Sequence, residues 1–496
     1  MGEKDRGKLQ TDPEKSSREM IDDVTTVGFD DDQWVGKIYG EPSKLPLSVK
    51  DICFHHHDAK GNPTGVIDHR IFQYITHTQH IFVCGGVPYI YEGGYYHADF
   101  RGTMIKTLIK DCCLEQFIRS TTTKRIYELF LQDWRLEKTP DELNHYSGHY
   151  INFENGMYDA IKKKVYPHNA KILSTNQLPW SYTANGSHGR GTEIEKFLKF
   201  AVPKDDDREM LLEYIGLCCT KDVRQQKMLV ICGQGGTGKS TIINLIQKLV
   251  GKRNISNVPM SSLGEKFQAI NMMGKLLNSC ADLEIDALDD VTMVKKLVGE
   301  DAISDSYKGK DIVSFDNYAK LLFSTNELPL VRNEKTAGFY RRLLILPMNE
   351  KPDRRDPRLI DRLEEELPYL LHLAMDAMNR MYERGNILES ENSKYLVQQL
   401  RNDSDTIEAF IFDMCVTDEA NAKVSRSELY EEYEQYCKDS ERQAHKKQNF
   451  FKALANKGFG KCMTKGTRMF KGIRLKGSGD NEFVPIPESD DDMPFG

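Results

Sequence analysis

The chain has 496 residues, the length of roughly three domains at about 150 residues each, which excludes a peptide hormone or a small disulfide scaffold. The net charge is −7, so the chain has no overall basic field and any DNA-binding surface must be local. The 11 cysteines show no C-x-x-C spacing and the sequence has no signal peptide, which is typical of a reducing cytoplasm. No apolar run approaches the 18 or so residues of a membrane helix, so we expect a soluble protein with no membrane contact.

The first part of the chain changes from an acidic tail to a globular pattern. Residues 1–44 are rich in acids and poor in large apolar residues, which predicts a disordered tail. Residues 45–188 contain the helical pattern VIDHRIFQYI and two hairpin signals, one at Gly93 and one at Gly156, and we interpret them as a mixed α/β N-terminal domain. Residues 189–222 contain two amphipathic helical patterns, which predicts a helical linker.

The middle of the chain alternates buried strands with helical stretches. KMLVICG, KLLNSCADLEI and YAKLLFSTN are apolar strand patterns within residues 223–385, and helical patterns separate them. This alternation is typical of a parallel sheet with crossover helices. The fold class is therefore α/β.

The last part of the chain is strongly basic. Residues 386–480 contain two helical patterns, the first opening with a predicted capping box at Ser425, and then a basic hairpin, which indicates a winged-helix-like domain. Residues 440–476 hold eleven Lys and Arg and one acid, which favours a DNA clamp or origin-binding element. We expect Lys446 and Lys447, at the start of the second helix, to contact phosphates. An acidic tail follows at 481–496.

The strongest motif is the glycine-rich run GQGGTGKS, which lies between an apolar strand and the helix STIINLIQKLV. Backbone N–H groups of such a loop surround a β-phosphate, a lysine neutralises the β and γ oxygens, and the following hydroxyl can ligate Mg²⁺. We therefore expect ATP and Mg²⁺ as cofactors, with Ser240 as a metal ligand. The predicted nucleotide-binding residues are Gly233, Gln234, Gly235, Gly236, Thr237, Gly238, Lys239, Ser240 and Thr241.

Polar residues that suit phosphate chemistry follow the later strands. Asp282 and Glu284 face the same side of an extended strand, where one holds Mg²⁺ and one orients or deprotonates water; we assign the metal to Asp282. Asn326 ends the strand KLLFSTN and is placed to position the attacking water. Arg341 and Arg342 precede the next apolar strand, where a guanidinium can stabilise charge on phosphate in trans across a subunit boundary.

The order GQGGTGKST, LLNSCADLEID, STNELP and GFYRRLLILP closely resembles the superfamily-3 helicases, above all the phage, plasmid and poxvirus replicative helicases that are fused to or partnered with a primase. With INFENGMYDA upstream, the resemblance covers roughly residues 64–476. It implies an AAA+-like P-loop ATPase core over 223–385 and a collar-like domain over 45–188. It also implies that Lys239 binds nucleotide, that Asn326 is the motif C sensor, and that Arg341 or Arg342 is the arginine finger.

The resemblance implies further roles and shows two departures. SYKGKD is the expected DNA-contacting hairpin, with Lys308 and Lys310 following backbone phosphates in a central channel. Relatives often carry two adjacent Walker B acids, whereas a leucine separates Asp282 from Glu284 here, so the catalytic base stays open between them. Few residues precede the resembling region, so we expect any primase or polymerase to be a separate protein.

The leading hypothesis is an ATP-dependent replicative helicase of a phage or mobile element, a homo-oligomer, expected as a hexameric ring, that acts on single-stranded and forked DNA in the cytoplasm of a bacterial host. The alternative is a nucleotide-dependent origin-binding initiator or loader without sustained unwinding. A protein unfoldase would need an aromatic pore loop, whereas SYKGKD is cationic. The run His55-His56-His57 does not suit a metal site, since three successive histidines cannot all face one ion in regular structure.

Overall fold

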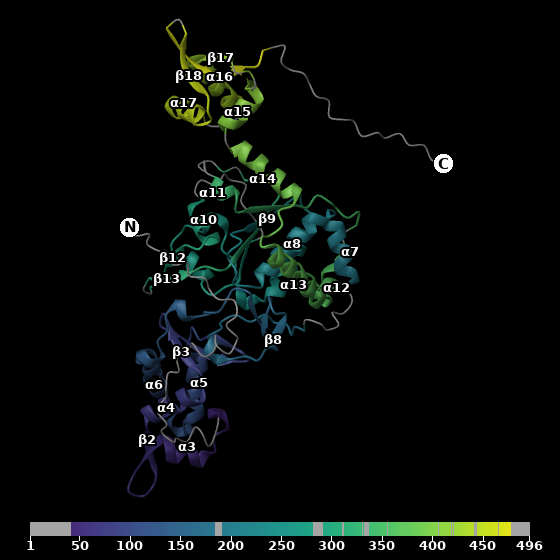
Figure 1. The fold of residues 1–496 in the computed structure, drawn as a ribbon. Coiled ribbons are helices and arrows are strands. Elements are labelled where there is room, and N and C mark those ends of the chain that lie inside the picture. The colour runs from purple at the N-terminus through teal and green to yellow at the C-terminus, as the bar shows by residue number, and fades with distance from the viewer. Residues whose placement is uncertain are drawn as a thin grey trace, which may run out of the picture. The chain divides into compact units, whose positions relative to one another are not determined.

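The computed structural model describes residues 41–183, 191–280, 291–309, 312–329, 331, 337–354, 356–404, 406–417, 419, 421–440, 444–464 and 466–477. Their contacts divide the described residues into two compact units (Figure 1). The first unit contains residues up to 280, 292–327 and 341–393, and the second contains 291, 328–340 and those from 394 onward. The predicted domain boundaries stay predictions.

The amino-terminal part of the first unit is a helical cluster with a small sheet. α4 buries Ile71, Phe72 and Ile75 on one face and packs against α5 and α6. Phe54 and Phe130 complete a core from which water is excluded. The elements are η1 (Pro42–Lys44), α3 (Leu47–Phe54), β1 (His55–His57), β2 (Pro63–Val66), α4 (Asp68–Thr78), β3 (Ile81–Cys84), β4 (Val87–Glu92), β5 (Tyr95–Ala98), α5 (Thr103–Cys112), η2 (Glu115–Phe117), α6 (Ser120–Gln132), η3 (Trp134–Leu136) and η4 (Pro140–Glu142).

Both predicted hairpins are present. β4 and β5 pair in an antiparallel ladder around Gly93 and Gly94, which both have positive φ. The second turn, at Gly156, joins β6 (Tyr150–Phe153) to β7 (Gly156–Asp159), and β8 (Lys164–Tyr166) continues that sheet. A Cβ on Gly156 would lie 2.3 Å from the carbonyl oxygen of Tyr166, so only glycine fits at the start of β7, next to β8. The short helix η5 (Ala170–Ile172) follows.

A five-stranded parallel sheet forms the centre of the first unit, which confirms the predicted α/β class. Its strand order is β10-β11-β14-β9-β15, so β9 lies between two strands that come much later in the chain. Nearly all side chains of the three central strands are buried, as expected for a sheet covered on both faces. The strands are β9 (Met228–Cys232), β10 (Ile255–Ser256), β11 (Leu277–Cys280), β14 (Lys320–Thr325) and β15 (Leu343–Pro347).

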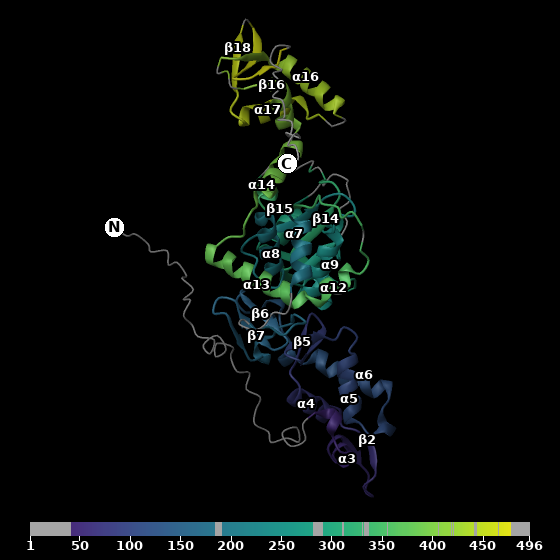
Figure 2. The same ribbon diagram turned by 90° about the vertical axis from the view of Figure 1, so that its right-hand side faces the viewer.

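Helices cover this sheet and share one large core with it. α9 packs against β11, β14, α12 and α13, and α8 packs along α13 (Figure 2). The buried hydroxyl of Tyr214 on α8 donates to the carbonyl oxygen of Leu321 on β14 at 2.7 Å. The remaining elements of the unit are α7 (Thr192–Ala201), α8 (Asp205–Cys218), α9 (Lys239–Val250), η6 (Lys252–Asn254), η7 (Met260–Ser262), η8 (Ala269–Met272), α10 (Thr292–Val298), β12 (Ala302–Asp305), β13 (Val313–Asp316), α12 (Leu359–Glu365) and α13 (Leu367–Arg384).

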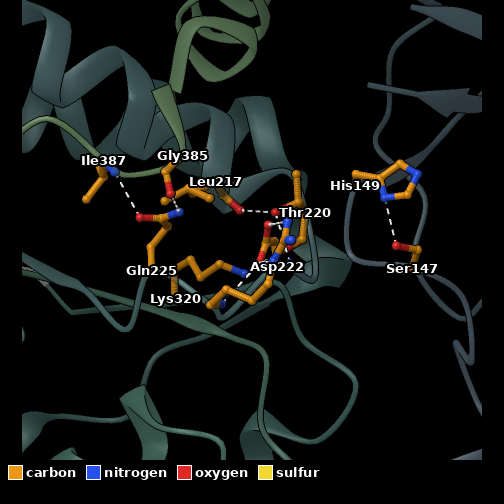
Figure 3. Close-up of polar contacts among 10 residues, drawn as sticks. Ser147, His149, Leu217, Thr220, Asp222, Gln225, Lys320, Gly385 and Ile387 are labelled. Atoms are coloured by element: carbon orange, nitrogen blue, oxygen red, sulfur yellow. Dashed lines mark hydrogen bonds and ion pairs between the residues drawn. The ribbon is translucent and has the colours of Figure 1, made fainter. Parts of the chain in front are cut away.

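Polar contacts fix the loop that leads from α8 into β9 (Figure 3). The buried Lys320 donates from Nζ to the carbonyl oxygen of Thr220 at 2.8 Å. The hydroxyl of Thr220 donates to the carbonyl oxygen of Leu217 at 2.9 Å and accepts a hydrogen bond from the N–H of Asp222 at 3.1 Å. Gln225 Oε1 accepts the N–H of Ile387 at 2.8 Å, so the loop is also attached to the segment after α13. These contacts hold the amino-terminal end of β9.

The second unit combines helices with a three-stranded antiparallel sheet of order β17-β19-β18. Tyr433 and Phe450 stack at 4.4 Å in its core, and Phe410 contacts both rings. α16 begins after Ser425 as predicted, but the Ser425 side chain makes no capping hydrogen bond, so the predicted capping box is wrong. The elements are α11 (Ala337–Tyr340), α15 (Thr406–Met414), β16 (Cys415–Val416), β17 (Lys423–Ser425), α16 (Arg426–Asp439), α17 (Lys447–Asn456), β18 (Gly460–Thr464), β19 (Thr467–Lys471) and β20 (Arg474–Leu475), and α14 (Glu391–Ser404) leads into this unit.

Candidate functional site

The glycine-rich loop joins the end of β9 at Cys232 to the start of α9 at Lys239. A Cβ on Gly233 would lie 1.9 Å from the carbonyl oxygen of Met348, so the chain can pass the end of β15 only as glycine. Gly238 has a φ of 93° and precedes the first helical residue. A Cβ added to Gly235 or Gly236 would meet no atom within 4 Å, so the backbone of the loop is open to a ligand on that side.

The side chain of Lys239 turns back over this loop. Its ammonium donates to the carbonyl oxygens of Gly233 and, at 2.9 Å, Gln234. It also donates to Oδ1 of Asn326 at 3.0 Å. Asn326 follows directly after β14, and β14 pairs with β9 so that Thr325 is opposite Cys232. Two residues separated by 87 positions in the sequence therefore meet at the carboxyl edge of the sheet.

Cys232, the last residue of β9, lies next to this contact. Its Sγ donates to the carbonyl oxygen of Asn326 at 3.8 Å. Burial raises the pKa of the Cys232 thiol, and the charge of Glu327 raises it further, whereas the charge of Lys239 lowers it. The group is therefore a neutral thiol at physiological pH and not an activated nucleophile.

Other residues of the loop have distinct positions. Thr237 is buried, and its hydroxyl donates to the carbonyl oxygen of Gln234 at 3.0 Å, so it holds the shape of the loop. Ser240 is exposed in the first turn of α9, and Thr241 next to it is half-buried. Sequence reasoning missed Lys351, whose ammonium lies 3.0 Å from Oε1 of Gln234. No motif marks Lys351, because only tertiary packing brings the segment after β15 beside the loop.

The two predicted acids, Asp282 and Glu284, lie outside the described residues. The strand before them is described: β11 ends at Cys280 and pairs in parallel with β14, with Cys280 opposite Phe323. The chain therefore leaves β11 at the same edge of the sheet at which Lys239 and Asn326 meet.

Arg341 and Arg342 lie at the amino-terminal ends of the strands, opposite to the carboxyl ends at which Lys239 and Asn326 meet. They precede β15, whose first residue, Leu343, is opposite Met228 at the amino end of β9. The five residues of β9 therefore separate them from the glycine-rich loop of the same chain by roughly 16 Å at about 3.3 Å per residue. Arg341 is exposed and its guanidinium lies 3.3 Å from Oε1 of Gln226, whereas Arg342 is half-buried with a buried Nε.

The strands that flank the segment predicted to contact DNA, β12 and β13, form an antiparallel pair from Ala302 with Asp316 to Asp305 with Val313. Lys308 is exposed in the turn between them, next to Gly309 with a φ of 77°. Lys310 lies outside the described residues.

Lys446 and Lys447 lie at the amino-terminal end of α17, and both are exposed. The Lys447 ammonium lies 5.2 Å from the centre of the Tyr430 ring, so the lysine side chain packs against α16. The contact leaves the charged end of the side chain at the surface.

The histidines of β1 have local partners. Nδ1 of His55 lies 2.9 Å from the carbonyl oxygen of Lys50, and Nε2 of His57 lies 2.8 Å from Asp51. Within the described ranges, no three His, Cys, Asp or Glu side chains form a group that could hold a metal ion. The helices of the same ranges include none that is long and apolar enough to cross a membrane.

Three family models match separate segments of the chain. Residues 69–203 match the model "D5 N terminal like", residues 231–342 match a family of unknown function, DUF5906, and residues 402–475 match the model "Poxvirus D5 protein-like". The second segment begins within β9 and ends at Arg342, so it contains the glycine-rich loop, Asn326 and both arginines.

The chain is also similar to two viral proteins described as putative helicases. It is 25% identical over 219 residues to putative helicase L207/L206 of Acanthamoeba polyphaga mimivirus, and 24% identical over 217 residues to putative helicase 184R of Invertebrate iridescent virus 6. Each alignment covers 40% of this chain and 22% of the relative, so the chain spans about a fifth of the length of the curated relatives it matches.

Among solved structures, the chain is similar to the apo form of the NrS-1 C-terminal region. Sequence identity is 11% and the TM-score is 0.47, with 81% of this chain and 98% of that chain covered. A second structure of that region gives 12% identity and a TM-score of 0.45, with 82% of this chain and 98% of that chain covered. Taken together, the sequence matches relate the chain to D5-type proteins and viral putative helicases.

Proposed function

We propose that this chain is an ATP-dependent replicative DNA helicase of the superfamily-3, primase-associated type, with a P-loop ATPase core and a winged-helix-like second unit. The observation that carries the proposal is the contact between Lys239 and Asn326 at the carboxyl edge of the parallel sheet. A lysine at the start of such a helix contacts the phosphates of a bound nucleotide, and an amide at the end of the neighbouring strand is placed to orient the attacking water. The D5-type matches and the putative viral helicases support the same function.

The described residues fit a nucleotide phosphate, and they include one of the two proposed ligands of its metal ion. The open side of Gly235 and Gly236 leaves room for an anion against backbone N–H groups at the start of α9. Ser240 would hold Mg²⁺, which neutralises charge between the β- and γ-phosphates when it is bound. Asp282 is the second proposed ligand.

The roles of the remaining residues follow from their places. Lys239 donates to loop carbonyl oxygens and to Asn326 in this structure, and these bonds give way to phosphate oxygens when nucleotide binds. Asn326 orients the attacking water, and Asp282 or Glu284 accepts its proton. Arg341 or Arg342 acts on the nucleotide of a neighbouring subunit, because neither reaches the loop of its own chain. This requires a homo-oligomer, which we propose is a hexameric ring with Lys308 and Lys310 toward the DNA.

Strand displacement tests the proposal directly. The purified chain should hydrolyse ATP, DNA should accelerate hydrolysis, and the chain should separate a forked duplex in the presence of ATP and Mg²⁺. The Lys239→Ala variant is the matched control, because it removes the phosphate contact and leaves the DNA contacts. A chain that hydrolyses ATP but never separates the fork would contradict the helicase assignment.

The alternative is a nucleotide-dependent initiator or loader that binds an origin and recruits other enzymes. The exposed Lys446 and Lys447 at the start of α17 favour a DNA-binding second unit under either function. Sequence-specific binding to one duplex, together with ATP-dependent assembly but no strand displacement, would support the alternative. A bacterial host and a separate primase or polymerase partner stay predictions.

A further inference from the structure

A basic groove runs between α5 and α6, far along the chain from the glycine-rich loop and Asn326. Its volume is about 510 Å³, within the range of ligand sites in proteins. Lys106 and Lys110 are four residues apart on one side of α5, next to the face that buries Ile105 and Ile109. The lining residues, which we call the α5–α6 groove, are Lys106, Lys110, Ile118, Arg119, Ser120, Thr123, Lys124, Tyr127 and Glu128.

The charge of this groove is not neutralised by the fold. Four of its nine lining residues are cations and one, Glu128, is an acid. None of the four cations forms an ion pair with any residue in the described part of the chain. Arg125 provides the contrast, since it is the neighbour of Lys124 and both of its bonds go to the carboxylate of Asp68.

Like charges held together raise the free energy of the folded chain, and a bound polyanion lowers it again. The partners of Lys106 are uncharged groups, so this lysine keeps its positive charge within the groove. Its ammonium donates to the carbonyl oxygen of Arg101 at 3.0 Å and lies 4.7 Å from the centre of the Tyr127 ring. Neither contact removes its charge. Arg119 and Ser120 begin α6, and the positive end of that helix adds to the potential.

Apolar surface lies among these charges. Ile118 is 39% exposed, and the half-buried ring of Tyr127 also lines the groove. A single strand of nucleic acid presents alternating phosphates and flat base faces, which match cations and apolar or aromatic side chains in turn. A duplex hides its base faces in the stack and presents phosphates and base edges, so it offers no flat face to Tyr127.

We propose that the α5–α6 groove binds single-stranded nucleic acid through its phosphodiester backbone, with a base against Tyr127. The four cations are the phosphate contacts. This site shares no residue with the Lys308 turn or with α17, and it needs neither ATP nor strand separation. Failure of the proposed helicase activity therefore leaves this inference standing, and the reverse also holds.

The test uses the full chain without ATP, in a background that carries Lys308→Ala, Lys310→Ala, Lys446→Ala and Lys447→Ala so that the other proposed DNA contacts are absent. The probe is a fluorescent oligo-dT of about 12 nucleotides, which suits a single short groove, and anisotropy gives its affinity. Ultraviolet cross-linking followed by peptide mass spectrometry locates the contact. The groove variant changes Lys106, Lys110, Arg119 and Lys124 to Gln.

A control variant removes the same number of charges elsewhere in the first unit. Its four exposed lysines, also changed to Gln, are Lys60, Lys162, Lys164 and Lys171. We expect the groove variant to bind at least about tenfold more weakly, and the slope of log affinity against log salt to fall by about 2.8, at roughly 0.7 for each phosphate that is no longer neutralised. The control variant should bind as the background does, and cross-links should map to residues 101–128.

Four results would overturn the proposal. These are no binding in the background, equal losses in the groove and control variants, equally tight binding of a duplex of the same length, or displacement of oligo-dT by poly-glutamate of the same charge. The last result would mark an acidic protein partner instead. Equal melting temperatures show that the groove variant is folded, and a variant with Arg in place of Lys106, Lys110 and Lys124 should keep the binding.

Discussion

The ammonium of Lys239 lies 3.0 Å from Oδ1 of Asn326 and joins the start of α9 to the end of β14. The two residues follow different strands of the sheet, β9 and β14, and the parallel pairing of these strands brings them to one edge. The contact gives the proposed ATPase a defined pair of residues to test.

Lys239→Ala should lower ATP turnover by at least about 100-fold, because it removes a charge positioned on the reacting phosphates. The melting temperature should change little, since the ammonium donates to the loop and to Asn326 rather than filling a hydrophobic core. Asn326→Ala should lower turnover while nucleotide binding is kept. Lys196→Ala, on the exposed face of α7, is the matched control. Normal turnover in the Lys239 variant would show that the site is misassigned.

The two acids after β11 can be separated by their different roles. Asp282→Asn and Glu284→Gln keep the shape of each side chain and remove its charge. The metal ligand should lose affinity for the Mg²⁺ complex of the nucleotide, and the base should lose turnover with binding kept. Titration with a fluorescent nucleotide and steady-state turnover distinguish these results. If neither substitution has an effect, the acidic strand has been misplaced.

The arginines call for a mixing experiment. Arg341→Ala or Arg342→Ala chains mixed with Lys239→Ala chains should recover part of the ATP turnover, because some interfaces then combine an intact loop with an intact arginine. Arg342 is half-buried and packs near Gly299, so Arg342→Ala should also lower the melting temperature. Arg341 is exposed, and its substitution should leave stability unchanged. Failure to recover turnover at any ratio contradicts action in trans by independent subunits.

The proposed DNA contacts should fail in different ways. Replacing Lys308 and Lys310 by Ala should remove unwinding and the stimulation by DNA while basal ATP turnover stays, since neither residue is expected to touch nucleotide. Replacing Lys446 and Lys447 should weaken DNA loading and reduce the salt slope by about 0.7 to 0.9 for each phosphate that is no longer neutralised. Normal unwinding by the first variant would show that the β12–β13 turn is an ordinary solvated turn.

Lys221 should stabilise the fold by an increasing amount as pH rises above neutral. Burial lowers the pKa of Lys221 to about 7, and the neighbouring charge of Lys320 contributes to the same shift. Above that pH the unfolded chain binds more protons than the folded chain until the ordinary lysine pKa is reached, so this lysine adds up to about 1.4 kcal/mol of stability per pH unit.

Lys221→Met removes this dependence. The melting temperature of the variant relative to the unchanged chain should be highest near about pH 6 and should fall steadily towards about pH 10. Lys196→Met, at an exposed position on α7, should show a constant difference. A constant difference for Lys221→Met as well would mean that Lys221 is charged in the folded chain across this range.

The sequence predicts the strands well because a parallel sheet covered on both faces requires continuous apolar runs, and KMLVICG and KLLFSTN have them. It does not predict the strand order, because β9 pairs with β14 and β15 across long separations in the sequence. The same limit applies to side chains. Motifs identify Lys239 and Asn326, but the contact of Lys351 with Gln234 depends on packing alone.

Local rules also have exceptions. Ser425 precedes α16 where the sequence predicts it, yet its hydroxyl makes no capping bond. The guanidinium of the next residue, Arg426, lies 4.2 Å from the centre of the Phe451 ring and 5.3 Å from that of Phe470. The start of this helix is therefore held by packing against α17 and β19, which local sequence does not encode.

The separation of the glycine-rich loop and the two arginines along β9 has a consequence for how the chain would be controlled. Under the proposed function, an isolated chain has the glycine-rich loop at one end of its strands and the two arginines at the other. It therefore has no complete ATPase site until it meets a second copy. The rate of ATP turnover should then rise more steeply than in proportion to the amount of protein, until most copies have found neighbours. Dilution would act as an inhibitor, and the amount of protein made in the cell would set when replication can begin.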